Sequence, residues 1–190
     1  LQVKTMTPKK PMIFHGQNGL SKKGPNEGQA SYYYSYTDLA TRGFIRTSSS
    51  TSRIDVCGTS WFDHEFGSNQ LASNQAGWDW FSLHLSDGKD LMIYFLRRKD
   101  GQLEAASSGT LISAEGRSTH LRLSDITMEV LDHWKSPKSR GRYPSRWRIV
   151  VPSMGIDVIV APLVAAQELV TEGSTGIVYW EGAVEGRGKS

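Results

Sequence analysis

The chain has 190 residues, 38% of them hydrophobic and 10% aromatic, which is enough to build a packed core and excludes wholesale disorder. Its 22 basic and 19 acidic side chains give a net charge of +3, too small to indicate nucleic-acid binding by itself. A single cysteine, Cys57, excludes an intrachain disulfide and a cysteine-based zinc framework, and no apolar run approaches the ~18 residues of a membrane-spanning helix.

Short segments rich in β-forming residues recur along the chain and are separated by turn residues. The predicted strands are 31–39, 53–62, 78–85, 91–98, 109–113, 120–130, 146–151, 156–161 and 176–184. Helical spacing is confined to 163–172, a segment that is predicted either as a helix or as the end of a strand. Many short strands with regular turns indicate an all-β barrel or sandwich.

The Asp-Gly pair at 87–88 predicts a hairpin between two of these strands. With a two-residue turn there, Trp80 lies opposite Phe95 and Phe81 lies opposite Tyr94. Both faces of this hairpin are largely apolar, whereas a half-exposed strand shows one polar face. One face is therefore expected to line a barrel interior. The other packs either within the same domain or against a second domain.

Two carboxyl groups and a histidine follow one another in the aromatic segment 58–67. In an extended chain Trp61, Asp63 and Glu65 point to one face, and His64 points to the other. A carboxyl beside an indole and a second carboxylate acquires a raised pKa, because both surroundings disfavour the charged form, and a general acid needs this property. An exposed edge strand, or an ion pair with an arginine, is the structural alternative for these residues.

No metal site is predicted. Adjacent strand residues point to opposite faces, so His64 does not readily join Asp63 and Glu65 on one ion, and neither a His-x-His pair nor a His-Glu-x-x-His motif occurs. The remaining histidines are expected to be hydrogen-bonded structural residues. They are His15, His84, His120 and His133.

The segment 135–148 carries six positive charges and no acidic residue, with aromatic residues interleaved. Such a pattern is typical either of an RNA or phosphate surface or of a basic surface loop, and we interpret it as the loop. No nucleic-acid partner and no cofactor are expected. Crowded aromatic residues elsewhere are either ordinary core or the lining of a pocket for an apolar ligand or a developing cation.

Several motifs of the chain together resemble one known family. They are Phe14-His-Gly16, Ala30-Ser-Tyr-Tyr-Tyr-Ser35, Gly58-Thr-Ser-Trp-Phe-Asp-His-Glu-Phe-Gly67, Gly77-Trp-Asp-Trp-Phe-Ser82, Tyr143-Pro-Ser-Arg-Trp147 and Tyr179-Trp-Glu-Gly-Ala183. The chain is similar over nearly its whole length to the AttH-like proteins. Their lipocalin-like superfamily includes carotenoid 1,2-hydratases and proteins labelled predicted secreted hydrolases. No Gly-x-Ser-x-Gly nucleophile motif of a hydrolase is present.

The resemblance implies an all-β, lipocalin-like antiparallel β-barrel within a two-barrel protein. Residues 1–190 are then expected to span the end of one barrel and most of a second, and a missing second barrel domain of the same protein is the expected partner. The resemblance also implies a hydrophobic, isoprenoid- or lipid-like ligand and a periplasmic or secreted location, although the sequence itself leaves the compartment open.

The family's hydratases add water to an isoprenoid double bond without a cofactor. A protonated aspartic acid gives its proton to the alkene, and aromatic rings stabilise the carbocation. By resemblance Asp63 takes the place of that acid and Trp61 that of a neighbouring tyrosine, while Tyr34 and Tyr36 stand where hydratases carry a His-x-Trp pair. Glu65 is expected to raise the pKa of Asp63 or to position water.

The expected ligand-binding residues are Trp61, His64, Tyr34, Tyr36, Trp78, Trp80 and Tyr94. The alternative function is a non-catalytic, lipocalin-like binding protein, in which Asp63 and Glu65 form a structural cluster.

Overall fold

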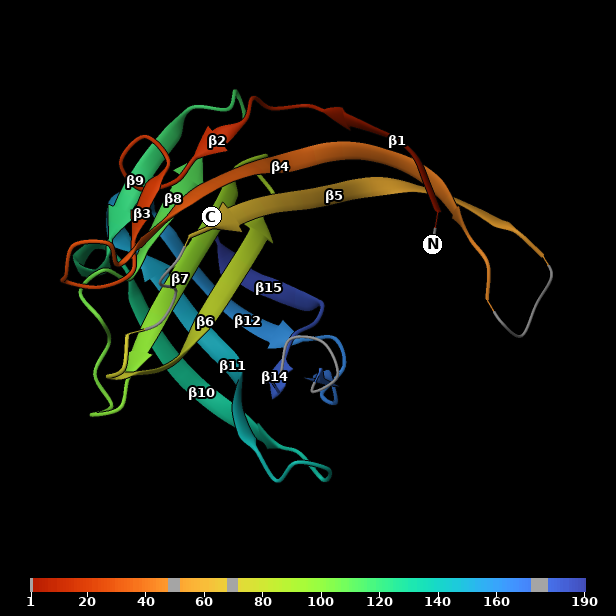
Figure 1. The fold of residues 1–190 in the computed structure, drawn as a ribbon. Helices are drawn as coiled ribbons and strands as arrows, with labels where there is room; N and C mark the ends of the chain where they lie inside the picture. Colours follow the sequence, from red (N-terminus) through yellow and green to blue (C-terminus); the bar gives the residue numbers. More distant parts are fainter. Residues whose placement is uncertain (1, 48–51, 68–71, 172–177) are drawn as a thin grey trace. The chain divides into compact units, whose positions relative to one another are not determined.

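The computed structural model describes residues 2–47, 52–67, 72–171 and 178–190, and almost all of this chain is antiparallel strand or turn (Figure 1). Within these ranges the only helices are two short 3-10 turns, η1 (Leu123–Asp125) and η2 (Pro152–Met154). None of the described helices is long and apolar enough to cross a membrane. The all-β, lipocalin-like fold class predicted from the sequence is confirmed.

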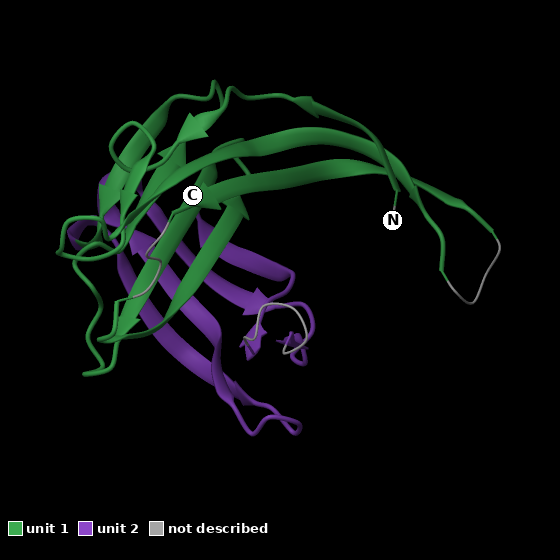
Figure 2. Ribbon diagram, in the orientation of Figure 1, with its two compact units in different colours: residues 1–123 green, residues 124–190 purple. Residues whose placement is uncertain are grey.

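The chain divides into two compact units, residues 1–123 and 124–190 (Figure 2). Unit 1 contains two sheets, and its strands are β1 (Gln2–Pro8), β2 (Ile13–Phe14), β3 (Leu20–Lys22), β4 (Ala30–Ile45), β5 (Ile54–Phe66), β6 (Gln75–His84), β7 (Asp90–Arg98), β8 (Ser108–Ile112) and β9 (Ser118–Arg122). In the first sheet β1, β2, β3 and β5 all pair with β4, and the second sheet has the order β6-β7-β8-β9.

The long strands β4 and β5 form a ribbon of 16 and 13 residues, longer than the sequence predicts. The residues of β4 alternate between buried and partly exposed from Ser31 to Leu39, which is the pattern of a strand with one face on a core. Small hydroxyl side chains and Tyr33 occupy the buried face. The other face carries Tyr32, Tyr34 and Tyr36, as the alternation in the sequence indicates.

The hairpin of β6 and β7 has a different register from the predicted one. The backbone N–H of Leu85 donates to the carbonyl of Lys89, and Gly88 closes the loop with a φ of 82°, so three residues connect the strands. Trp80 consequently pairs with Tyr94, not with Phe95. The prediction of a two-residue turn is wrong by one position, because an Asp-Gly pair also fits a three-residue loop with a left-handed glycine.

Unit 2 is a four-stranded sheet of order β10-β11-β12-β15 with a small separate pair, β13-β14. Its strands are β10 (Thr127–Lys135), β11 (Arg142–Val151), β12 (Ile156–Pro162), β13 (Glu168–Val170), β14 (Val178–Trp180) and β15 (Val184–Lys189). Its buried side chains include Trp147, Ile149, Val151, Val158 and Val160. The alternation of apolar and polar residues along β11 and β12 places them on one face.

Two segments near and within unit 2 differ from their predicted structure, and in a third the structure selects the strand over the helix. The predicted strand 120–130 is interrupted by η1, and 176–184 is divided between β14 and β15, with 176–177 outside the described residues. The segment 163–172 is not a helix over its described part, 163–171. Its residues 168–170 pair as a strand with β14, and the carboxylate of Glu168 accepts hydrogen bonds from Ser136 and Tyr143. Tertiary pairing therefore overrides a weak helical pattern.

Candidate functional site

Asp63 lies on the face of β5 that looks into unit 1, between its two sheets. On β4, Ser35 is its direct cross-strand partner and Tyr33 is the partner of Glu65. Directly opposite residues of an antiparallel pair point the same way, so these side chains share one face. Tyr33 is buried and packs with residues of the second sheet in a cluster that also contains Trp61. The alternation predicted for Trp61, Asp63 and Glu65 is confirmed.

The carboxyl of Asp63 is surrounded by hydrogen-bond donors. Its Oδ1 accepts from the Nε1–H of Trp61 at 2.9 Å and from the hydroxyl of Ser35, and the hydroxyl of Tyr33 also bonds to it. Burial raises the pKa of Asp63 above its usual value, although these three hydrogen bonds oppose the rise and the charge of Glu65 adds only a little to it. Within the described part of the chain, no lysine or arginine forms an ion pair with Asp63.

Glu65 has different surroundings from Asp63. Its Oε1 lies 2.6 Å from the Nζ of Lys23 and accepts a hydrogen bond of 2.5 Å from Ser31. The ammonium of Lys23 also lies 3.9 Å from the ring centre of Tyr94, within the range of a cation–π contact. The ion-pair alternative raised from the sequence therefore applies to Glu65, with a lysine in place of an arginine, and not to Asp63.

Aromatic rings from both sheets of unit 1 gather beside the acid. The indole N–H of Trp80 donates to the hydroxyl of Tyr33 at 3.1 Å, and Tyr94 belongs to the same buried cluster as Tyr33. Trp78 shares the face of Trp80 because the two are separated by one residue on β6. Trp78 and Trp80 remain 43% and 36% exposed, so this aromatic surface is partly open.

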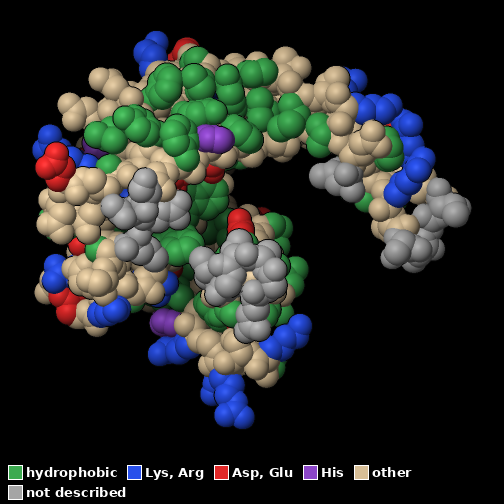
Figure 3. Space-filling model, in the orientation of Figure 1, with side chains coloured by type: hydrophobic (Ala, Val, Ile, Leu, Met, Phe, Trp, Pro, Cys, Tyr) green, Lys and Arg blue, Asp and Glu red, His purple; other side chains and the backbone are tan. Residues whose placement is uncertain are grey.

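Three residues predicted for the same site lie on the opposite face of the β4–β5 ribbon. Tyr34 and His64 are cross-strand partners whose rings stack with centres 5.1 Å apart, and Tyr36 pairs with Phe62. Hydrophobic side chains gather along β4 and β5 in the space-filling view (Figure 3). The structure does not bring these residues together with Asp63, so a role for them in ligand binding stays a prediction.

A buried ion pair anchors the same region from the other side. The Nζ of Lys10 lies 2.7 Å from Oδ2 of Asp90, which also accepts from Thr37, while Oδ1 meets Nδ1 of His84 at 2.8 Å. Burial alone raises the pKa of Asp90, but the hydrogen bonds from His84, Lys10 and Thr37 outweigh it and lower that pKa overall. The ring of His84 contacts Trp61 edge to face. Through His84, the ion pair supports the position of Trp61, which donates a hydrogen bond to Asp63.

A family model described as AttH-like matches residues 3–190. The chain belongs to the AttH-like family. A solved AttH protein of Nitrosomonas europaea is 37% identical with a TM-score of 0.87, over 96% of this chain and 55% of its own. The chain of kievitone hydratase from Nectria haematococca is 16% identical with a TM-score of 0.69, over 88% of this chain and 50% of its own, which shows a shared fold. No protein of curated function matches.

This AttH-like chain spans about half the length of both solved relatives. That it forms part of a two-barrel protein stays a prediction. Within the described residues no group of three or more histidine, cysteine, aspartate or glutamate side chains is arranged to hold a metal ion.

Sequence reasoning missed Tyr33 and Ser35 of this AttH-like site, and it placed His15 only among structural histidines. Tyr33 directly precedes Tyr34, the first of the two tyrosines predicted for the site, and the register of β4 against β5 decides which tyrosine faces Asp63. His15 is 1% exposed, and its ring lies with its centre 4.3 Å from that of Tyr33. Its only signal in the sequence is its place in the Phe14-His-Gly16 motif.

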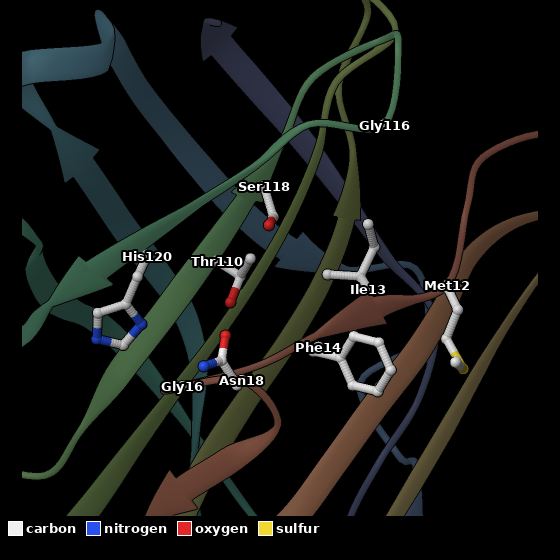
Figure 4. Close-up of a pocket in the computed structure, with 9 residues that line it drawn as sticks. All are labelled: Met12, Ile13, Phe14, Gly16, Asn18, Thr110, Gly116, Ser118 and His120. Carbon is white, nitrogen blue, oxygen red and sulfur yellow. The ribbon is translucent and has the colours of Figure 1, made fainter.

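A cavity of about 370 Å³ lies elsewhere in unit 1 of the AttH-like chain and was not predicted (Figure 4). It is lined by Met12, Ile13, Phe14, Gly16, Asn18, Thr110, Gly116, Ser118 and His120. Figure 4 shows Thr110 on β8 and His120 on β9 among these residues.

Proposed function

We propose that this AttH-like chain holds a hydrophobic, isoprenoid- or lipid-like ligand against the aromatic surface beside Asp63 and adds water across its C=C bond. The observation that carries the proposal is a carboxyl with a raised pKa that has no cationic partner among the described residues and is set among Trp61, Tyr33 and Trp80. The shared fold with a protein named kievitone hydratase supports the same class of reaction.

The reaction begins with Asp63 protonated. Its proton passes to one carbon of the double bond, and positive charge develops on the more substituted carbon. The π faces of Trp61 and Trp80 stabilise that charge, since a cation within about 6 Å of such a ring is attracted to it. Water then bonds to the cationic carbon and gives a proton to the carboxylate, so the acid is regenerated. No cofactor takes part in these reaction steps.

Glu65 has a supporting role in this proposal. It forms an ion pair with Lys23 close to Asp63, and its charge contributes to the raised pKa of Asp63, but less than burial does. Tyr33 remains protonated at neutral pH because burial raises its pKa, so its hydroxyl is available as a donor to the carboxylate that forms.

The test is hydration of an isoprenoid alkene by the purified chain in ¹⁸O-labelled water, read by mass spectrometry of the alcohol. We expect Asp63→Asn to lower turnover by ~10²–10⁴-fold, the usual contribution of general acid catalysis, with unchanged folding by circular dichroism. Asp132→Asn, at an exposed carboxyl of unit 2, is the matched control. An Asp63→Asn chain that keeps full activity refutes the assignment.

A second candidate, a non-catalytic ligand-binding protein, is favoured by the three donors that converge on Asp63, because they stabilise the carboxylate rather than the acid. In that case Asp63 and the Lys23–Glu65 pair are structural. Recovery of a bound isoprenoid unchanged after long incubation, with no ¹⁸O incorporated, supports this candidate against the hydratase.

A further inference from the structure

A chain of hydrogen bonds runs from Asp63 through the interior of unit 1. The hydroxyl of Ser35 donates to Oδ1 of Asp63 and lies 2.7 Å from Nε2 of His15. On the other side of the ring, Nδ1 of His15 lies 2.9 Å from Oγ1 of Thr110. Ser35, His15 and Thr110 are all at most 2% exposed, so the chain of hydrogen bonds is shielded from bulk solvent.

The chain allows two arrangements of protons. When Asp63 is ionised, Ser35 donates to it, and the single hydroxyl proton of Ser35 is then used. Nε2 of His15 must therefore carry a proton and donate to Ser35, while Nδ1 accepts from Thr110. When Oδ1 of Asp63 is protonated, every bond reverses, and His15 carries its proton on Nδ1.

His15 stays neutral in both arrangements. Burial, with smaller contributions from the nearby charges of Lys23 and His120, lowers its pKa to about 3. The other group that faces the ring closely is the aromatic ring of Tyr33. When Asp63 gains or loses its proton, His15 therefore changes its tautomer and does not become a charged imidazolium.

Thr110 connects this chain to the cavity described above. It is one of the lining residues, together with Ser118 and His120 (Figure 4). A cavity of about 370 Å³ with hydroxyl, amide and imidazole groups in its lining has room and partners for water.

We propose that Ser35, His15 and Thr110 form a proton wire that loads Asp63 from this cavity, with the tautomer of His15 as its switch. The hydroxyl of Thr110 takes a proton from cavity water and gives its own to Nδ1. Nε2–H passes to Ser35, and the proton of Ser35 passes to Oδ1 of Asp63. One proton leaves the cavity and one arrives at the acid, while His15 remains neutral. His15 is a positioning residue, because it acts on the substrate only through Asp63.

The catalytic use of the wire rests on the proposed hydratase function, whereas the wire itself does not. A ligand that covers the aromatic surface separates Asp63 from solvent on that side, and the wire then sets the protonation of the acid from the opposite side. The water that adds to the substrate returns a proton to Asp63 in each turnover. The wire is therefore needed only to protonate Asp63 at the start.

The test is nuclear magnetic resonance of the ligand-free chain labelled with ¹⁵N-histidine and ¹³C-aspartate. We expect His15 to change from the Nε2–H to the Nδ1–H tautomer as the pH falls, with the same midpoint as the carboxyl signal of Asp63. In Asp63→Asn the transition disappears. A His15 that keeps one tautomer throughout the titration of Asp63, or becomes doubly protonated over it, overturns the proposal.

A second variant separates the wire from the reaction. Thr110→Val removes the hydroxyl without changing the shape of the side chain, so the Nδ1–H tautomer and the coupled midpoint should be lost. Thr119→Val, at an exposed position of β9, is the matched control and should keep both. Coupling in a chain that hydrates no alkene leaves the wire standing and refutes the hydratase. Hydration by a chain in which His15 keeps one tautomer supports the hydratase and refutes the wire.

Discussion

Replacing Lys10 with methionine tests the buried ion pair that supports the acid. Lys10 and Asp90 have side chains only 5% and 3% exposed, and the ammonium also donates to the carbonyl of Gly88 at 2.7 Å. Methionine matches the length of the aliphatic chain but leaves the buried carboxylate of Asp90 without its ammonium partner. Breaking a buried ion pair from one side costs ~3–5 kcal/mol. We therefore expect Lys10→Met to lower the free energy of unfolding by about that amount, measured by urea denaturation.

The neighbouring residue provides a matched control. Lys9 forms an ion pair of 3.1 Å with Asp38, but its side chain is 51% exposed, and exposed pairs contribute only about 0–1 kcal/mol. Lys9→Met should therefore leave the free energy of unfolding nearly unchanged. If both variants lose the same amount, or if Lys10→Met loses less than about 1 kcal/mol, burial does not govern the strength of this pair.

The pH dependence of the same pair has a definite sign. The folded state lowers the pKa of Asp90, so its contribution to stability is present above the pKa of the unfolded chain and is lost as the pH falls through the lowered folded value. The wild-type chain should lose stability on acidification over that range. Asp90→Asn should be less stable at neutral pH and should show a flatter profile.

Two further predictions concern the hairpin and the acid. Gly88→Ala should destabilise the chain by about 1 kcal/mol, because Gly88 has a φ of 82°. Gly58→Ala, where nothing lies within 4 Å of an added Cβ, should not destabilise it. Equal urea midpoints for the two variants contradict the three-residue loop. Lys23→Met removes the cation that balances Glu65, so the pKa of Asp63 should rise and the acid should stay protonated to higher pH. An unchanged pH profile of hydration contradicts a coupled pair of carboxyls.

Alternation along single strands was readable from the sequence, whereas pairing between strands was not. The face shared by Trp61, Asp63 and Glu65 follows from a period of two and is confirmed. The partner of Trp80 depends on whether the loop has two or three residues, and an Asp-Gly pair permits both. A shift of one residue moved Tyr94 from the face opposite Trp80 to the same face, and this brought both rings to the acid.

The dependence on strand pairing also explains why the sequence predicts Tyr34, and not Tyr33, for the site. Four tyrosines within five residues give no local sign of which one meets Asp63, since that depends on a ladder to a strand about thirty residues away. His15 lies still further from the acid in sequence, and it reaches the site through its hydrogen bond to Ser35 and its ring contact with Tyr33. Long-range register, not residue type, therefore decided the composition of the site.

Ser35 determines which of the two candidate functions the site can perform. The indole N–H of Trp61 can only donate, and the raised pKa keeps the hydroxyl of Tyr33 protonated, so both stabilise a carboxylate. A hydroxyl can donate or accept, and Ser35 is hydrogen-bonded on its other side to a ring nitrogen of His15, which can exchange the donor role with it without movement of a heavy atom. An acid that must hold and release a proton in a buried site needs such a neighbour. Ser35→Ala should therefore cost more activity than the loss of one donor explains, because it removes the partner that accepts from the protonated acid as well as the link to His15.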